Sequence, residues 1–266
     1  MNVTNIIKTS LKYPQTSIKN VVIYTAFLIL FYIAYSLAYA TIAFNKLLQL
    51  MSYSNISNSR NLVFFNTLIQ NNSIVFAISI ICLIILLILI AGYIYRIYEG
   101  LENLPDFNNL QLLLVQGIKV IGLSIIYLII PVAILLIGCS LYSNIGLLLI
   151  IIAIIALIIL GLFILPIAMG IMVKNDDFKS ALEFESIIEK IKEITLTNYV
   201  GAVILSLIAQ TIIIISFLVI SLLLIALTSI IPILSLIVAV ICFIVDFFVF
   251  SYLQIFSIKV YQLLCD

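Results

Sequence analysis

Six apolar runs divide the sequence, and each is long enough to cross a lipid bilayer as an α-helix. A hydrocarbon core of about 30 Å requires roughly 20 apolar residues at 1.5 Å per residue. The runs cover residues 21–44, 74–95, 119–137, 145–170, 200–227 and 232–258. We therefore expect an all-α integral membrane protein in which residues 1–266 form a single domain of six transmembrane helices.

The composition excludes a soluble domain and several classes of enzyme. Hydrophobic residues make up 65% of the chain and charged residues 9%, whereas about a quarter of the residues in soluble domains are charged. The sequence contains no histidine, so it has no imidazole base, no histidine metal ligand and no histidine-containing triad. The four cysteines are scattered singly, which favours neither a disulfide framework nor a thiolate metal site. A net charge of +1 gives no electrostatic reason to expect nucleic acid as a partner, and we expect no cofactor.

The distribution of basic residues predicts how the chain is oriented. An even number of spans places both termini on one side of the membrane. Ten of the twelve Lys and Arg residues belong to this side, and only Lys46 and Arg60 belong to the other. Those two lie in residues 45–73, a segment rich in Asn and Ser that we expect to be an exposed loop. Because basic residues are enriched in cytoplasmic segments, we expect a multi-pass protein of the cell membrane with both termini in the cytoplasm.

Amphipathic segments precede the odd-numbered spans, and we expect them to lie on the cytoplasmic surface of the bilayer. In residues 177–196 most of the apolar side chains fall within an arc of about 140° at 100° per residue, which is typical of a surface helix. Residues 2–19 and 106–117 are weaker candidates. Residues 106–117 and 177–196 both open with an Asp-Phe pair, so the chain can be interpreted as three copies of a surface helix followed by a hairpin. The alternative is that three cytoplasmic segments are amphipathic without being repeats.

A polar elbow, residues 92–107, separates the second and third spans. Its charged residues are Arg96, Glu99, Glu102 and Asp106. The carboxylates suggest a weak metal site or a general acid and base beside the lipid headgroups, as a lipid-acting enzyme would need. The structural alternative is that Arg96 pairs with Glu99, that Asp106 caps the next helix and that Pro105 sets the corner.

Asp246 is the one charged residue well inside an apolar run, about 20 Å from either end of residues 232–258 at 1.5 Å per residue. A charge at such a depth is costly and suggests function. Gln210, on the fifth span, is the partner that we expect. One hypothesis is a proton-coupled transport site, and the other is a structural hydrogen bond between helices.

The first span carries an aromatic face. Its members fall within one arc of about 140° on a helix: Tyr24, Phe27, Phe31, Tyr32, Tyr35 and Tyr39. Such a face either lines a cavity for a lipid or solute or packs against other helices.

Four short motifs at the helix ends carry a family resemblance. They are Leu11-Lys12-Tyr13-Pro14, Gly92-Tyr93 followed by Arg96, Leu104-Pro105-Asp106-Phe107, and Gln116-Gly117. With these motifs the chain resembles, over nearly its whole length, a family of archaeal and bacterial multi-pass membrane proteins known as a domain of unknown function. Members of that family often carry Trp where Phe107 stands. The resemblance implies six spans without an assigned activity, and a looser similarity to the membrane portions of some glycerophosphodiesterases. It transfers no catalytic residue.

Three functions remain open from the sequence. The leading hypothesis is a non-enzymatic membrane module that interacts with membrane lipids, or with a partner protein at its cytoplasmic face. The first alternative is a small proton-coupled permease centred on Asp246. The second alternative is a membrane-bound lipid enzyme that uses the elbow carboxylates.

Cysteine labelling tests the predicted orientation. In a background in which the four native cysteines are replaced by serine, Ser57→Cys should react with an impermeant thiol reagent in intact cells, because the charge distribution places it outside. Ser186→Cys should react only after the cells are opened. Equal labelling of the two positions in intact cells would contradict a six-span protein with cytoplasmic termini.

Overall fold

Helices make up nearly all of the structure. The computed structural model describes the backbone of residues 3–54, 59–141, 144–194, 196–228 and 231–265, and within these ranges there is no β-strand. In chain order the elements are α1 (Val3–Lys12), the 3-10 helix η1 (Tyr13–Ser17), α2 (Ile18–Ser54), α3 (Ser59–Tyr98), α4 (Leu110–Ser140), α5 (Asn144–Ile159), the π-helical turn η2 (Leu160–Ile164), α6 (Leu165–Asn175), the 3-10 turn η3 (Ser180–Leu182), α7 (Phe184–Ile194), α8 (Leu196–Thr228) and α9 (Pro232–Cys265).

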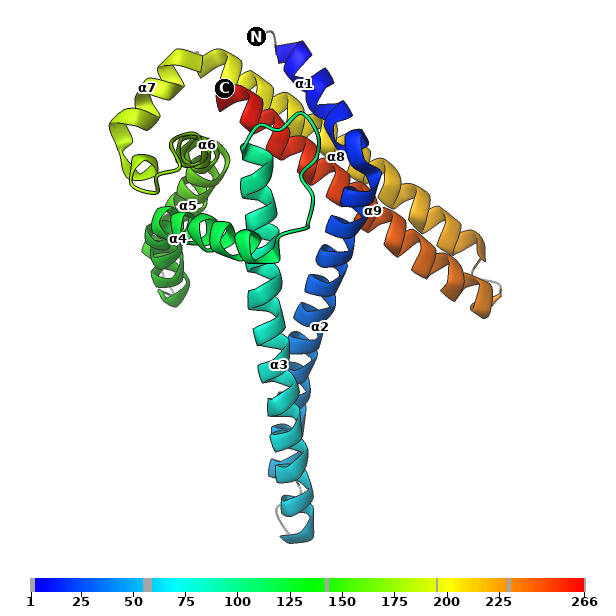
Figure 1. The fold of residues 1–266 in the computed structure, drawn as a ribbon. Helices are drawn as coiled ribbons and strands as arrows, with labels where there is room; N and C mark the ends of the chain where they lie inside the picture. The colour runs from blue at the N-terminus through cyan, green and yellow to red at the C-terminus, as the bar shows by residue number, and fades with distance from the viewer. Residues whose placement is uncertain (1–2, 55–58, 142–143, 195, 229–230, 266) are drawn as a thin grey trace.

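The six expected spans are confirmed, and they form three hairpins. Six helical segments of the described chain are long and apolar enough to cross a membrane. The hairpins, which we call the arms, are α2 with α3, α4 with α5 and α6, and α8 with α9. Figure 1 shows that the arms meet at the end of the molecule where both termini lie and diverge from one another beyond it. The molecule is therefore a splayed set of hairpins and not a closed bundle.

Residues 45–73 are helical wherever the backbone is described, so the expectation of a loop was wrong there. α2 continues to Ser54 and α3 begins at Ser59, so the first arm extends beyond both of its predicted spans. A helix satisfies its own backbone groups, and it can therefore continue through polar residues at the membrane boundary. The Asn72 side chain donates to the Thr41 carbonyl at 3.2 Å and to Asn45 Oδ1 at 2.9 Å, which ties the two helices together.

The arms meet in a packed region that we call the junction. It comprises α1, η1, the elbow, α6, α7 and the adjoining ends of α3, α4, α8 and α9. One of its two apolar clusters takes buried side chains from seven helices: Ile6, Tyr98, Leu123, Met172, Ile187, Val203 and Phe256. The other joins η1, α2, α3, the elbow, α4 and α9 through Tyr13, Tyr24, Tyr93, Leu104, Leu113 and Ile255. Contacts between segments far apart in the chain are concentrated here.

α3 and α4 cross at very short range because a glycine of each faces the backbone of the other. A Cβ atom added to Gly92 would lie 1.9 Å from the Leu113 carbonyl oxygen. A Cβ atom added to Gly117 would lie 1.9 Å from the Ile88 carbonyl oxygen. Small residues allow membrane helices to approach in this way. The reciprocal contact attaches the second arm to the first.

A π-helical turn, Leu160–Ile164, interrupts the fourth span between α5 and α6. Pro166 has no backbone N–H to donate, and it lies directly after this turn, at the start of α6. The Tyr199 hydroxyl of α8 donates to the Phe163 carbonyl oxygen within the turn at 2.9 Å. The irregular turn therefore provides an acceptor that links the second arm to the third.

Separate surface helices precede two of the three arms. α1 and η1 precede the first arm, and η3 and α7 precede the third. The expected surface helix at 106–117 is not formed, because α4 begins at Leu110 and continues unbroken to Ser140. All three hairpins of the suggested repeat are thus present, but a separate surface helix precedes only the first and the third hairpin among the described residues.

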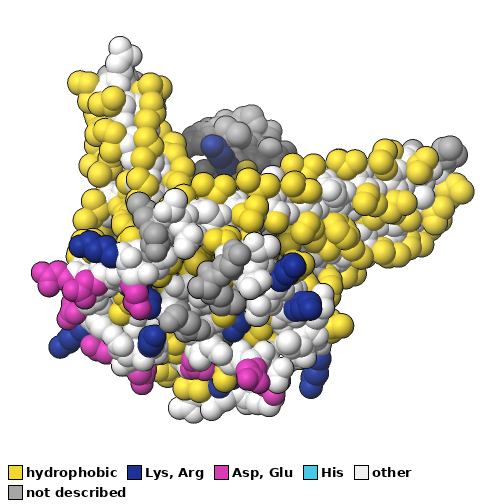
Figure 2. All heavy atoms as spheres, turned by 90° about the horizontal axis from the view of Figure 1, so that it is seen from above, with side chains coloured by type: hydrophobic (Ala, Val, Ile, Leu, Met, Phe, Trp, Pro, Cys, Tyr) yellow, Lys and Arg dark blue, Asp and Glu magenta, His cyan; other side chains and the backbone are white. Residues whose placement is uncertain are grey.

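Most of the charged side chains are collected at the junction. Figure 2 shows Lys, Arg, Asp and Glu side chains on the central body, while the arms that extend from it are covered by hydrophobic side chains. This separation is typical of membrane proteins, in which charged residues are kept out of the apolar spans.

The crossing of α3 and α4 can be tested with single methyl groups. Gly92→Ala and Gly117→Ala should each lower the free energy of unfolding in detergent by about 1–3 kcal/mol, because the added methyl overlaps a backbone carbonyl. Gly201→Ala is the matched control, since nothing lies within 4 Å of its added Cβ. That control should be neutral or stabilising by up to about 1 kcal/mol. Equal unfolding midpoints for all three variants would show that the helices do not cross closely.

Candidate functional site

The elbow is held in place by the N-terminal segment. Asn20 donates from its amide to the Leu104 carbonyl oxygen at 3.3 Å and to Asp106 Oδ1 at 2.9 Å. Thr16 Oγ1 accepts the Leu104 N–H at 3.1 Å. The Tyr13 hydroxyl donates to the Asn103 carbonyl oxygen at 3.3 Å. Thr16 and Asn20 could not be identified from the sequence, because their partners lie more than 80 residues away and no local pattern marks them.

The predicted pairing of Arg96 with Glu99 and the predicted cap at Asp106 are both wrong. Arg96 donates to the Asp106 carbonyl oxygen at 2.7 Å and has no ion pair with Glu99 among the described residues. Asn109, not Asp106, caps α4, since its side-chain oxygen accepts the Leu112 N–H at 3.1 Å. The non-helical connection therefore continues three residues beyond Asp106.

Two of the elbow carboxylates take separate partners. Glu99 accepts a hydrogen bond from Gln116 at 2.9 Å, while Asp106 accepts one from Asn20 at 2.9 Å. Within the part of the chain that the structure describes, no three Asp, Glu or Cys side chains form a group that could hold a metal ion.

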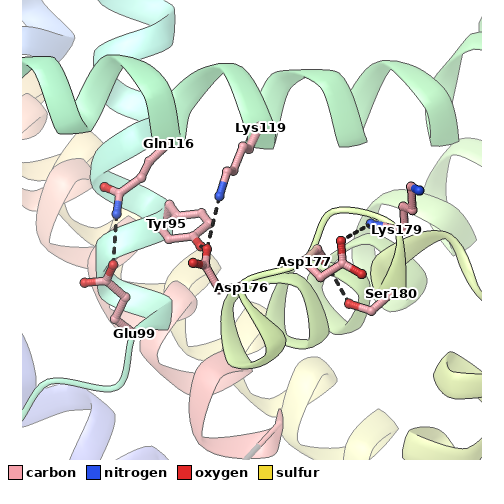
Figure 3. A network of polar contacts seen from close by, with 8 residues as sticks. All are labelled: Tyr95, Glu99, Gln116, Lys119, Asp176, Asp177, Lys179 and Ser180. Carbon is pink, nitrogen blue, oxygen red and sulfur yellow. Dashed lines mark hydrogen bonds and ion pairs between the residues drawn. The ribbon is translucent and has the colours of Figure 1, made fainter.

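A second group of polar side chains links three helices through one carboxylate (Figure 3). The Lys119 ammonium group donates to Asp176 Oδ1 at 3.1 Å, and the Tyr95 hydroxyl donates to the same oxygen at 3.2 Å. Asp176 directly follows α6 with a left-handed φ of 47°, so its carboxylate points back towards α3 and α4. The hydrogen bond and positive charge of Lys119 lower the pKa of Asp176 below its usual value. This group joins α3, α4 and α6 at the junction.

Lys259 was counted only as a basic residue of the C-terminal segment, yet it is buried in the junction. Its side chain is 5% exposed, and its ammonium group donates to the Leu101 carbonyl oxygen at 3.3 Å. The same group lies 4.4 Å from the centre of the Tyr13 ring, within the range of a cation–π contact. Lys259 thereby joins α9, η1 and the elbow.

The aromatic face of the first span is divided between two environments. Near the junction, Tyr24 stacks on Tyr93 with ring centres 5.2 Å apart, and Tyr93 stacks on Phe107 at 4.2 Å. Phe27 lies against Phe107 at 5.3 Å. Further along α2, Phe31 and Tyr32 line a cavity. The sequence left cavity and packing open, and the structure contains both.

Asp246 is bonded to Ser221, and the expected pairing with Gln210 is not formed. Ser221 Oγ donates to Asp246 Oδ1 at 3.0 Å. Gln210 donates instead to the Ser206 carbonyl oxygen of its own helix at 3.2 Å. Ser221 lies 11 residues further along α8 than Gln210, which is about 16 Å at 1.5 Å per residue. The register between α8 and α9 therefore differs from the one that equal depth suggested.

Asp246 opens into the cavity that Phe31 and Tyr32 line. The cavity has a volume of about 460 Å³ and lies between α2, α8 and α9, where the first and third arms separate. Its remaining wall is apolar apart from Gln254, whose Oε1 accepts a hydrogen bond from the Tyr24 hydroxyl at 3.0 Å. An apolar pocket of this size with a few polar groups is typical of a small-molecule site. The structure thus brings two separate predictions, Asp246 and the aromatic face, into one place.

More than half of the chain matches one protein family. Residues 75–228, from the second span to the end of the fifth, match the family described as "Protein of unknown function (DUF4013)". No curated protein and no solved structure matches the chain. The looser similarity to glycerophosphodiesterases stays a prediction. Because the match covers more than half of its residues, the chain belongs to the DUF4013 family.

Proposed function

We propose that this protein is a non-enzymatic membrane module that receives lipids or the helices of a partner protein between its arms and presents its junction to the cytoplasm. The observation that carries the proposal is the splayed arrangement of three apolar arms on one packed junction (Figure 1). In the fourth, fifth and sixth spans, only 6% of the most apolar stretch is buried within the chain. These helices therefore offer most of their surface to other components of the membrane.

The proposed orientation rests on charge and on the surface helices. Ten of the twelve basic residues lie at or near the junction, which favours its placement in the cytoplasm. α7 covers the junction with Ile187, which is 2% exposed, whereas Phe184 and Ile188 on the same helix are 61% and 48% exposed. An amphipathic helix with such a free apolar edge suits the boundary between headgroups and acyl chains.

Photocrosslinking distinguishes open arms from a closed bundle. With benzoylphenylalanine at position 222, which as Leu222 is 66% exposed on α8, we expect adducts with lipids or with another membrane protein. The matched control is position 253, where Leu253 is 2% exposed and any link should be internal. Internal links from position 222 to the second arm would show that the arms close on one another and would overturn the proposal.

Two neighbouring substitutions test how α7 is docked. Ile188→Asp places a charge on the exposed edge, and it should release α7 from the membrane while leaving the junction folded. Ile187→Asp places a charge in the buried cluster, and it should destabilise the junction as a whole. Hydrogen exchange in lipid nanodiscs should therefore increase only in residues 180–194 for the first variant and also in α6 and α8 for the second. Fast exchange of α7 in the unmodified protein would contradict a docked surface helix.

A further inference from the structure

The Asp246 carboxylate faces its cavity without a basic partner. None of the residues that line the cavity is Lys or Arg, and the chain has no histidine. Among the described residues, Ser221 is the one side chain that donates a hydrogen bond to the carboxylate, and it reaches Oδ1. A positive charge nearby stabilises a carboxylate in apolar surroundings. No residue of the cavity wall supplies one, so a cationic ligand is the complement that this carboxylate would favour.

The walls around this carboxylate are unusually aromatic. Five of the lining residues carry rings: Phe31, Tyr32, Phe217, Phe247 and Phe250. Tyr32 lies edge-on to Phe247 with ring centres 5.5 Å apart, and Phe243 adds a third ring at 4.6 Å from Phe247. Ring faces attract cations, and they attract weakly hydrated organic cations in particular because little hydration has to be removed.

The same walls disfavour a metal ion. Calcium and magnesium ions need about six oxygen ligands, whereas the side chains of this cavity offer one carboxylate, the Gln254 amide and the Tyr32 hydroxyl. The Gln254 oxygen already accepts the Tyr24 hydroxyl. A cation that fits must therefore bring its own apolar shell in place of coordinated water.

The cavity also has a route to the membrane. Tyr32, Leu218 and Phe250 line it and are between 43% and 48% exposed, and they belong to three different helices. A volume of about 460 Å³ lies within the range of pockets for drug-sized ligands. An amphiphilic ligand that has partitioned into the bilayer can enter from the side.

From these observations we infer that the cavity between α2, α8 and α9 binds a monovalent organic cation with an apolar body, such as a quaternary ammonium or phosphonium ion carrying alkyl or aryl groups. Asp246 neutralises the charge of the cation, and Tyr32 and Phe247 contact its substituents through their ring faces. This inference goes beyond the membrane module, because it assigns a small-molecule ligand to one defined cavity.

Two probes of the same shape and opposite charge test the inference. Tetraphenylphosphonium and tetraphenylborate both partition into detergent and lipid, but only the first is a cation. In equilibrium dialysis with the purified full chain in nanodiscs, corrected for empty nanodiscs, we expect saturable binding of the phosphonium and none of the borate. Saturable binding of both ions, or of neither, would overturn the inference.

Variants locate the binding site. Asp246→Asn should weaken phosphonium binding by more than about tenfold, since the buried charge pair is lost. Glu99→Gln is the matched control, because it removes a carboxylate in the elbow, and it should bind as the unmodified protein does. Unchanged phosphonium binding by a folded Asp246→Asn protein would eliminate this site.

A second pair of variants keeps the test decisive if Asp246→Asn does not fold. Phe247→Leu retains an apolar side chain and removes a ring face, so the affinity should fall by about 2- to 30-fold. Phe184→Leu is the matched control, because it removes an exposed ring on α7 that does not line the cavity. It should leave the affinity for the phosphonium unchanged. Equal affinities for these two variants would contradict an aromatic cation site.

Discussion

The reciprocal contact of Gly92 with Leu113 and of Gly117 with Ile88 is the constraint on which much of the remaining structure depends. Two helices whose backbones touch cannot slide or rotate relative to each other without a clash. The chain must then turn back within the non-helical connection between Tyr98 and Leu110, which is only 11 residues long. This short return buries Leu104 and brings Phe107 onto the ring of Tyr93. The elbow motif is thus explained by the geometry of a tight corner, and no catalytic role is needed to account for it.

The molecule divides its interactions between two regions of different chemistry. At the junction, charged and amide side chains form specific pairs with segments from elsewhere in the chain, as Asn20 does with the elbow and Lys119 with Asp176. Along the arms, most hydroxyl groups bond within their own helix, as Ser79 and Thr211 do, and the exposed surface is aliphatic. Two contacts along the arms differ from this pattern, because they join two helices: Asn72 bonds to α2, and Asp246 bonds to Ser221. Of these two, Asp246 is the one that brings a carboxylate to a cavity between arms.

The sequence predicted the architecture well because hydrophobic length is a local property. Six apolar runs suffice to predict six spans. The amphipathic pattern of 177–196 includes the whole of α7, but the expected helix is shorter, because Glu183 is extended and separates the 3-10 turn η3 from α7. The composition of residues 45–73 led to the wrong prediction of a loop. Asn and Ser are typical of loops, but they do not prevent a helix from continuing beyond a span. Asp106 and Asn109 are both suitable N-cap residues, and the sequence alone does not show which of them caps α4.

The contacts of the site were harder to predict, because they depend on register. Equal depth suggested Gln210 for Asp246, but a hairpin can pair its helices with an offset, and the offset selects Ser221. The meeting of the α2 aromatic face with Asp246 could not be foreseen either, since it requires the first and third arms to lie side by side. The types of residue were visible in the sequence, while the partners were decided by packing between arms.

The contacts between α9 and the N-terminal segment set an order for assembly during synthesis. The Tyr252 hydroxyl donates to the Leu11 carbonyl oxygen across 241 residues, and Lys259 lies over Tyr13. A ribosome adding 5–20 residues per second needs roughly 12–48 s to make the intervening chain. Throughout that interval the N-terminal segment lacks its partners in α9, although Asn103 and Leu104 of the elbow, to which η1 bonds, are made much earlier. η1 can therefore engage the elbow before α9 exists, whereas α1, which contacts α8 and α9, completes its packing only when the end of the sixth span has been made.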